Sequence, residues 1–175
     1  MMVFERKEYI EDLVAQEGNG MIKIITGIRR CGKSYLLFKL YKQNLLDRGV
    51  QEDHIIEVNL EDRLNKKLRD PDALLEHIYG KIIDSDKYFV LLDEVQMVPE
   101  FEDVLNSFLD KNNVDVYVTG SNARFLSKDV ITEFRGRGWE IRIHPLSFKE
   151  YFDVIGGERQ VALEQYYLYG GLPKV

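Results

Sequence analysis

The sequence predicts an α/β domain built on a largely parallel β-sheet. Segments with strand patterns alternate with segments of helical period along most of the 175 residues, which is the order expected when helices connect parallel strands. Residues 88–92, YFVLL, are apolar or aromatic throughout, as expected for a parallel strand covered on both faces. A glycine-containing loop at residues 27–32 then separates a short apolar strand from a helix, which is a common junction in such domains.

The N-terminal half contains alternating helices and strands. Helices are expected at residues 8–16, 33–48 and 71–82, and strands at residues 21–26, 54–60 and 87–92. Asp70 caps the third helix and Pro71 occupies its first position, where the backbone N–H has no helical partner. The charged stretch at residues 61–70 is expected to be a solvated connection.

The C-terminal half continues the pattern and then changes to helices. A helix is expected at residues 99–111, strands at 114–119 and 139–144, and a less regular helical segment between Asn122 and Gly136. Ser147 and Glu150 form a capping box that begins a helix at Phe148, and a last helix covers residues 161–169. We expect a core of residues 1–146 and a helical segment, 147–175, that begins a lid or C-terminal region. The ending GGLPKV lacks a closing element and is expected to be a fragment boundary.

Composition indicates a folded protein without an obvious polyanion-binding character. The chain is 45% hydrophobic and 31% charged, near the average for folded domains. With 24 Lys and Arg against 30 Asp and Glu, its net charge is −6, which argues against dispersed binding to nucleic acids and leaves a local basic patch open. The single cysteine, Cys31, the charged N-terminus and the lack of a long apolar run together predict a cytoplasmic protein outside the membrane.

Residues 27–34, GIRRCGKS, match the P-loop or Walker A pattern GxxxxGK[ST] between a strand and a helix. Backbone N–H groups of such a loop point toward phosphate oxygens, Lys33 would reach the β- and γ-phosphates, and Ser34 would bind Mg²⁺. A glycine-rich turn without a ligand is the alternative. The candidate nucleotide-binding residues are Gly27, Ile28, Arg29, Arg30, Cys31, Gly32, Lys33, Ser34 and Tyr35. Cys31 could make binding redox-sensitive, or it could be a small packing residue.

Asp93 and Glu94 follow the apolar strand at residues 87–92 and resemble the second half of a P-loop site, the Walker B motif. An Asp at this position holds Mg²⁺ together with Ser34, while the following Glu polarises the water that attacks the γ-phosphate. This pair predicts hydrolysis, with a solvated strand end as the alternative. A small-molecule kinase needs no such glutamate, and the sequence shows no acceptor site for one. Gln96 could orient the pair or cap the next turn.

Two further groups are candidates for contact with the γ-phosphate. If the strand at 114–119 lies between the other two, Ser121 and Asn122 would sit beside the phosphate, although a turn or cap would explain them equally. Arg135 and Arg137 flank Gly136, from where a guanidinium could reach the phosphate of a neighbouring subunit. A basic surface turn is the alternative for them.

Five motifs together resemble one known family. They are GIRRCGKS, LLDEVQMVPEFEDVL, VYVTGSNARFLS, GRGWEIRIHPLSFKEY and YGGLP, in this order and spacing. The set resembles the prokaryotic AAA+ superfamily ATPases of the archaeal-ATPase-like group. The resemblance implies a three-layer α/β/α P-loop fold with a five-stranded parallel sheet, the P-loop strand central, and the start of a small helical lid.

The same resemblance implies ATP and Mg²⁺ as ligands, Asp93 with Glu94 as the second motif, and Ser121 with Asn122 as the first sensor. Arg137 is the nearest match to an arginine finger, which implies a homo-oligomer. Similar members continue into a winged-helix and a nuclease-like domain, so a DNA or protein partner would act there. A local cluster of Arg124, Lys128, Arg135 and Arg137 is a further candidate contact with DNA.

The sequence thus predicts Mg²⁺-dependent ATP binding and hydrolysis, with Lys33, Glu94, Asn122 and Arg137 as candidate catalytic residues. The alternative is a nucleotide-gated interaction or signalling module with little turnover.

Overall fold

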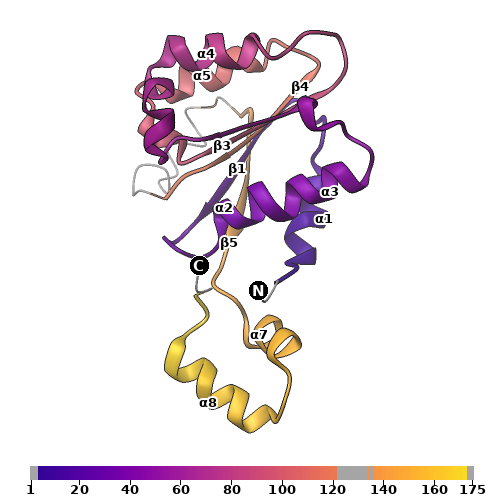
Figure 1. The fold of residues 1–175 in the computed structure, drawn as a ribbon, viewed down its shortest axis with the longest axis vertical. Helices are drawn as coiled ribbons and strands as arrows, with labels where there is room; N and C mark the ends of the chain where they lie inside the picture. The colour runs from indigo at the N-terminus through magenta and orange to yellow at the C-terminus, as the bar shows by residue number, and fades with distance from the viewer. Residues whose placement is uncertain (1–3, 122–133, 135, 173–175) are drawn as a thin grey trace.

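A computed structural model describes residues 4–121, 134 and 136–172. Its centre is a parallel sheet of five strands, arranged in the order β2-β3-β4-β1-β5 (Figure 1). The strands are β1 (Ile22–Gly27), β2 (Ile55–Asn59), β3 (Tyr88–Asp93), β4 (Val114–Thr119) and β5 (Gly138–Ile143). The predicted sheet is confirmed, and β4 lies between β1 and β3 as the polar end of residues 114–119 suggested. One expectation was wrong, because β4 is the central strand and the P-loop strand β1 lies beside the edge strand β5.

Helices cover both faces of the sheet, which gives the three layers expected (Figure 1). The helices are α1 (Lys7–Ala15), α2 (Lys33–Tyr35), α3 (Lys42–Asp47), α4 (Pro71–Tyr79), α5 (Phe101–Phe108), α7 (Phe148–Ile155) and α8 (Arg159–Tyr169). Helices α4 and α5 pack on one face, while α1 and the α2–α3 segment pack on the other. Within residues 4–121, 134 and 136–172, no helix combines the length and apolar character needed to cross a bilayer.

Two hydrophobic cores form because neighbouring side chains of a strand point to opposite faces. In β1, Ile24 belongs to the core under α4 and α5, whereas Ile25 belongs to the core under α1 and α3. In β3, Val90 and Leu91 divide in the same way, and both are fully buried. This double burial explains why the sequence of β3 is apolar throughout instead of alternating.

The connection between β2 and α4 is more ordered than a solvated linker. Residues Arg63–Arg69 form a 3-10 helix, which the charged composition of this stretch did not suggest. Asp62 accepts a hydrogen bond from the backbone N–H of Leu64 at 2.9 Å, and Arg69 Nε donates to the carbonyl of Leu60 at 2.8 Å. Polar side chains therefore bind the backbone here, while the other charged groups face solvent.

The segment after the P-loop is likewise continuous but not uniform. Between α2 and α3, residues Leu36–Tyr41 are π-helical, so the single predicted helix contains one widened section. Leu36, Leu37 and Tyr41 are buried against the sheet. The widened section therefore lies where the helix packs on the core that contains β1.

Helices α7 and α8 form a small pair beyond one end of the core (Figure 1). The predicted capping box is confirmed, because Ser147 Oγ accepts from the N–H of Glu150 and a Glu150 oxygen accepts from the N–H of Ser147. The rings of Phe148 and Tyr166 pack edge to face with centroids 5.6 Å apart. Arg6 links this pair to the core, since its guanidinium donates to the carbonyl of His144 and pairs with Glu150 at 3.1 Å.

A buried ion pair lies at the opposite end of the sheet from the P-loop. Lys23 on β1 is fully buried and pairs with Asp115 on β4, which also accepts hydrogen bonds from Gly18 N–H and Tyr117. Burial lowers the pKa of Lys23, and the hydrogen bond and charge of Asp115 oppose this effect. Asp115 is thus a buried acceptor that depends on several donors, with Lys23 as its fully buried cation.

We expect Lys23→Met to lower the free energy of unfolding by about 3 kcal/mol, because it leaves the buried Asp115 carboxylate without its main cation. Urea unfolding followed by circular dichroism measures this change. The exposed Lys81 provides the matched control, and Lys81→Met should change stability by less than about 0.5 kcal/mol. Equal effects of the two variants would contradict a special role of the buried pair.

Candidate functional site

The P-loop follows β1 and leads directly into α2, and two of its glycines are required by geometry. Gly27 has φ +151°, and a Cβ at this position would lie 2.5 Å from the carbonyl oxygen of Ile143. Gly32 has φ +99° immediately before α2, a backbone conformation that other residues adopt only with strain. The glycines therefore allow the chain to turn sharply between strand and helix.

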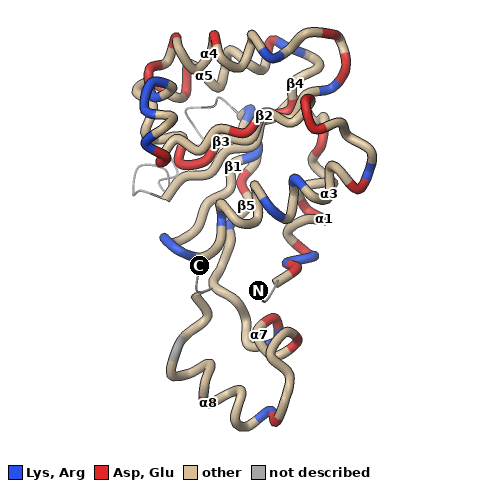
Figure 2. The backbone as a smooth tube through the Cα atoms, viewed as in Figure 1, with Lys and Arg blue, Asp and Glu red and all other residues tan. Residues whose placement is uncertain are grey.

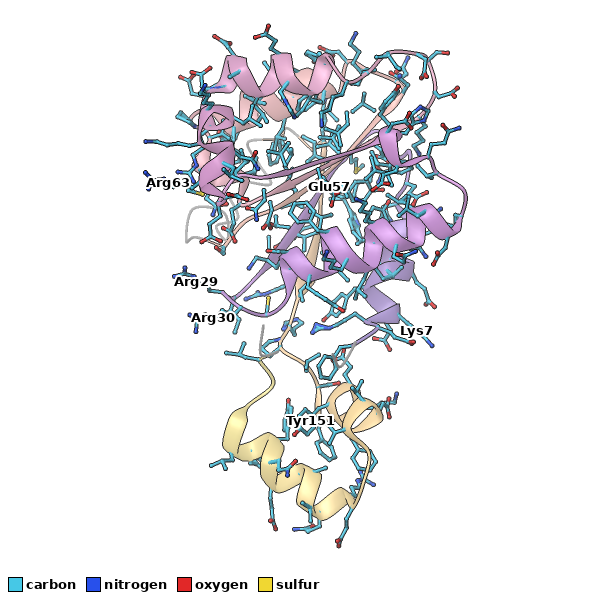
Figure 3. The ribbon with its side chains drawn as sticks, in the orientation of Figure 1. Lys7, Arg29, Arg30, Glu57, Arg63 and Tyr151 are labelled. Carbon is cyan, nitrogen blue, oxygen red and sulfur yellow. The ribbon has the colours of Figure 1, made fainter. Side chains whose placement is uncertain are left out.

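Lys33 lies inside this turn. Its side chain is almost completely buried, and its ammonium donates to the carbonyls of Gly27 and Ile28, each at 3.2 Å. Arg29 and Arg30, in contrast, are exposed and project away from the loop (Figure 3). Figure 2 shows a stretch of Lys or Arg positions on the backbone near the end of β1. Lys33 is thus the cation that the loop itself encloses.

Cys31 belongs to the packing of the loop and not to its exposed surface. It is 1% exposed and lies in the core beneath α1 and α3. Burial raises the pKa of the Cys31 thiol, which disfavours the reactive thiolate form. Of the two interpretations of this residue, the structure supports the small packing residue.

A chain of hydrogen bonds connects the P-loop to the ends of β3 and β4. Ser34 Oγ donates to Asp93 Oδ1 at 3.0 Å, and Thr119 Oγ1 donates to the same oxygen. Thr119 Oγ1 also accepts from the backbone N–H of Glu94 at 3.0 Å. Burial raises the pKa of the Asp93 carboxyl, while the bonds from Thr119 and Ser34 act in the opposite direction.

Thr119 is a site residue that the sequence argument did not identify. It is fully buried and is the last residue of β4. The signal was present, because a polar residue that ends a strand placed between β1 and β3 must lie beside the end of β3. The sequence prediction instead names Ser121 and Asn122, which follow it.

Glu94 is held in one orientation at the start of the turn after β3. Its backbone is left-handed, with φ 55° and ψ 48°. One carboxylate oxygen, Oε2, accepts hydrogen bonds from Ser121 Oγ at 2.7 Å and from Gln96 Nε2. The structure thus supports the interpretation in which Gln96 orients the acidic pair, and it places Ser121 next to Glu94.

A cavity of about 580 Å³ lies beside these groups. Its lining combines residues of the P-loop and the start of the following helix with residues that follow β2, β3 and β4, namely Arg29, Arg30, Gly32, Lys33, Ser34, Tyr35, Glu61, Glu94, Gln96, Met97 and Ser121. The volume lies in the range of small-molecule sites. The cavity has an enclosed cation at one side and carboxylates with hydroxyl groups at the other, a set suited to a phosphorylated ligand with a hard metal ion.

The remaining predicted residues lie elsewhere or outside the described part. Arg137 is exposed and immediately precedes β5. Because β5 runs parallel to β1, Arg137 lies at the end of the sheet opposite the P-loop of its own chain. Asn122 and the other basic residues of the candidate DNA cluster, Arg124, Lys128 and Arg135, lie outside the described residues.

The sheet order, the P-loop and the acidic pair define a P-loop domain of the AAA+ kind. Residues 19–152 match the model of a family described as an AAA domain, and the chain belongs to this family. A relative from Haemophilus influenzae is 34% identical over 179 residues, which cover 99% of this chain and 44% of the relative. A relative from Methanocaldococcus jannaschii is 30% identical over 168 residues, covering 88% of this chain and 36% of the relative. The chain therefore spans less than half the length of these curated relatives.

Solved structures agree on the fold. The chain is similar to the Aeropyrum pernix ORC1 protein, solved in complex with DNA, with a TM-score of 0.56 and 14% identity over 91% of this chain and 49% of that one. It is also similar to Cdc6p from Pyrobaculum aerophilum, with a TM-score of 0.56 and 16% identity over 97% of this chain and 50% of that one. At these identities the likeness establishes the fold alone.

We expect Thr119→Val to lower the free energy of unfolding by about 2 kcal/mol, because the isosteric valine leaves the N–H of Glu94 without a partner and leaves the buried Asp93 with Ser34 as its remaining hydroxyl donor. Thr26→Val on the neighbouring strand is the matched control. Thr26 is also buried, but it donates to Glu140, which is exposed to water. Thr26→Val should therefore lower the free energy of unfolding by about 1 kcal/mol or less. Chemical denaturation compares the two, and a smaller effect at Thr119 would contradict the bridging role.

Proposed function

We propose that this domain binds ATP with Mg²⁺ and hydrolyses it. The observation that carries the proposal is the contact between Ser34 of the P-loop and Asp93 at the end of β3, 3.0 Å apart, beside the enclosed Lys33. A hydroxyl and a carboxylate at this spacing are the protein ligands that Mg²⁺ takes in P-loop sites. Both are hard oxygen donors, so the residues present fit the ion.

Each P-loop group has a defined task in this proposal. Lys33 pairs with the β- and γ-phosphates in place of the carbonyls of Gly27 and Ile28, while loop N–H groups bind phosphate oxygens. Ser34 and Asp93 hold Mg²⁺, and the ion neutralises charge on the phosphate oxygens. Thr119 keeps the Asp93 carboxylate in position. Because Asp93 is buried and fixed by two hydroxyl groups, its carboxylate is already oriented before the ion binds.

Hydrolysis requires a base beside the γ-phosphate, and Glu94 is the residue we assign. The oxygen of an attacking water forms a bond to the γ-phosphorus as the bond between that phosphorus and the β–γ bridging oxygen breaks. The water gives one proton to Glu94, ADP leaves with the bridging oxygen, and inorganic phosphate is the second product. Glu94 lines the cavity and is held through its Oε2, which supports this assignment.

The exposed apolar surface of α8 supports a second function, a nucleotide-gated interaction module with little turnover. Tyr167 and Leu168 are 80% and 75% exposed. The helix packs on α7, which Arg6 joins to the core through Glu150. Neighbouring large apolar side chains that stay exposed are a feature of interaction surfaces. In this alternative, bound ATP changes the exposure of α8 instead of being consumed.

The organisation of the domain and its partners complete the proposal. Residues 1–146 would form the ATPase core and residues 147–175 the start of a lid, in a cytoplasmic protein. A DNA or protein partner would act through the part of the longer relatives that lies outside their alignment with this chain. The similar ORC1 structure contains DNA, which supports DNA as the first partner to examine.

Lys33→Ala is expected to weaken ATP binding by roughly 100-fold or more, because it removes the charge-assisted contacts to two phosphates. Titration with ATP and Mg²⁺ in a calorimeter measures the affinity. Lys39→Ala, at an exposed lysine of the following helical segment, should bind as the parent does. Unchanged binding by Lys33→Ala would exclude the P-loop as the phosphate site.

Glu94→Gln should bind ATP within about threefold of the parent and lose turnover by roughly 100-fold to 10,000-fold, since an amide cannot take the proton from water. Phosphate release at saturating ATP measures the rate, and calorimetry on the same sample measures the affinity. Hydrolysis at the parent rate would show that Glu94 is not the base. Parent protein that binds ATP without release at any concentration would favour the interaction module.

Arg137 is the residue we expect to act on a neighbouring subunit, since it lies away from the pocket of its own chain. The rate of ATP hydrolysis per subunit should rise with protein concentration, and Arg137→Ala should remove this rise. At high protein concentration the variant should hydrolyse ATP roughly 100-fold or more slowly than the parent. Arg142→Ala, at an exposed arginine within β5, is the control. A rate per subunit that is independent of concentration in the parent would contradict a shared site.

A further inference from the structure

Gln96 lies two residues after Glu94, in the 3-10 turn Val95–Met97, and its side chain lines the cavity. Its Nε2 donates to Glu94 Oε2. A carboxylate oxygen can only accept, so this contact fixes which end of the amide is nitrogen. The amide oxygen, Oε1, is therefore the end that does not face Glu94.

This amide oxygen is a buried acceptor without a donor. Gln96 Oε1 has no hydrogen-bond partner in the described part of the chain, although it is shielded from solvent. A buried acceptor in this condition costs about 1–3 kcal/mol, and native proteins rarely keep one without a functional reason. It is also the one such side-chain atom found among the described residues, and it belongs to a residue of the cavity lining.

The hydrogen bond that Gln96 Nε2 donates to Glu94 does not by itself explain why a glutamine occupies this position. Ser121 Oγ already donates to the same oxygen of Glu94, at 2.7 Å. The Glu94 carboxylate thus has two donors, Ser121 and Gln96, and of these two side chains Gln96 alone also carries a carbonyl oxygen. What distinguishes Gln96 from Ser121 is the unpaired acceptor.

We propose that Gln96 orients the attacking water, a role that rests on the hydrolysis proposed above. In the nucleotide-bound site its Oε1, which solvent does not reach in this structure, accepts one hydrogen of the water while Glu94 accepts the other, so a lone pair of the water oxygen points at the γ-phosphorus. The hydrogen bonded to Gln96 stays on the oxygen and ends on the phosphate product. The proton taken by Glu94 is released later, and Gln96 changes neither charge nor protonation.

Three variants separate orientation of water from support of Glu94. Gln96→Met keeps the length of the side chain and removes both polar ends. Turnover should fall by roughly 100-fold, the scale of losing one oriented polar contact to the reacting group, with ATP affinity within about threefold of the parent. Ser121→Ala removes only a donor to Glu94 and should lower turnover by less than about tenfold. Gln96→Asn is shorter by one methylene, and its turnover should lie between those of Gln96→Met and Ser121→Ala. Gln51→Met, at an exposed glutamine, is the control and should turn over ATP as fast as the parent.

A second readout does not depend on turnover. ADP with Mg²⁺ and aluminium fluoride mimics the γ-phosphoryl group with a water in line, so its affinity reports contacts to that water. Gln96→Met should weaken this complex by about the same factor as turnover and leave ADP binding unchanged. If Gln96 only stabilised the turn Val95–Met97, Gln96→Met would change the affinities for ADP and for the aluminium fluoride complex by the same factor.

The outcomes distinguish this role from the proposed function. If the parent hydrolyses ATP and Gln96→Met matches it, or falls no further than Ser121→Ala, the role of Gln96 is wrong while the ATPase assignment stands. If Gln96→Met loses ATP binding as well and Gln96→Asn does the same, Gln96 supports the pocket and does not orient water. A parent chain with no turnover at any concentration overturns the proposed function and this role together.

Discussion

Asp93 is a buried carboxylate at the end of β3, and the geometry of the whole site depends on how it is held. Its Oδ1 accepts from Ser34 of the P-loop and from Thr119 of β4. Three segments distant in sequence therefore converge on one oxygen atom. Since an unpaired buried carboxylate would cost several kcal/mol or would take up a proton, these hydroxyl groups are needed whether or not a ligand is bound. The ion proposed here would use a carboxylate that the fold already orients.

The order of the strands is what makes this convergence possible. The carboxyl ends of parallel strands lie at the same edge of a sheet, and β4 separates β1 from β3. The gap created by that central strand leaves space between the P-loop and the acidic pair, and Thr119 at its end bonds to both members of that pair, Asp93 and the N–H of Glu94. Continuous burial on both faces fixes the register of β3 and β4, because a shift by one residue would exchange the side chains of the two cores.

Much of the fold and part of the site could be predicted from sequence, and the differences have physical causes. The P-loop, the acidic pair and the capping box at Ser147 are local patterns, so their neighbours in sequence are their neighbours in space. The role of Thr119 depends on which strand lies beside β3, and a single residue pattern does not encode that. The 3-10 helix Arg63–Arg69 was missed because its order comes from contacts such as Arg69 with the carbonyl of Leu60, while its composition is that of an exposed linker. The sequence prediction of β1 as the central strand is wrong for the same reason. Which strand is central depends on the edge at which β5 pairs, and tertiary packing determines that edge.

The backbone at Glu94 shows how these contacts combine. A left-handed conformation at a residue other than glycine costs roughly 1–2 kcal/mol, and Glu94 adopts one with φ 55°. The N–H of Glu94 is bonded to Thr119, and its carboxylate to Ser121 and Gln96, so the surroundings determine this conformation at both ends of the residue. Glu94 is held in this conformation in the lining of the cavity that also contains Lys33 and Ser34. The hydroxyl of Thr119 that fixes Asp93 is the same group that accepts the N–H of Glu94 and so stabilises this turn.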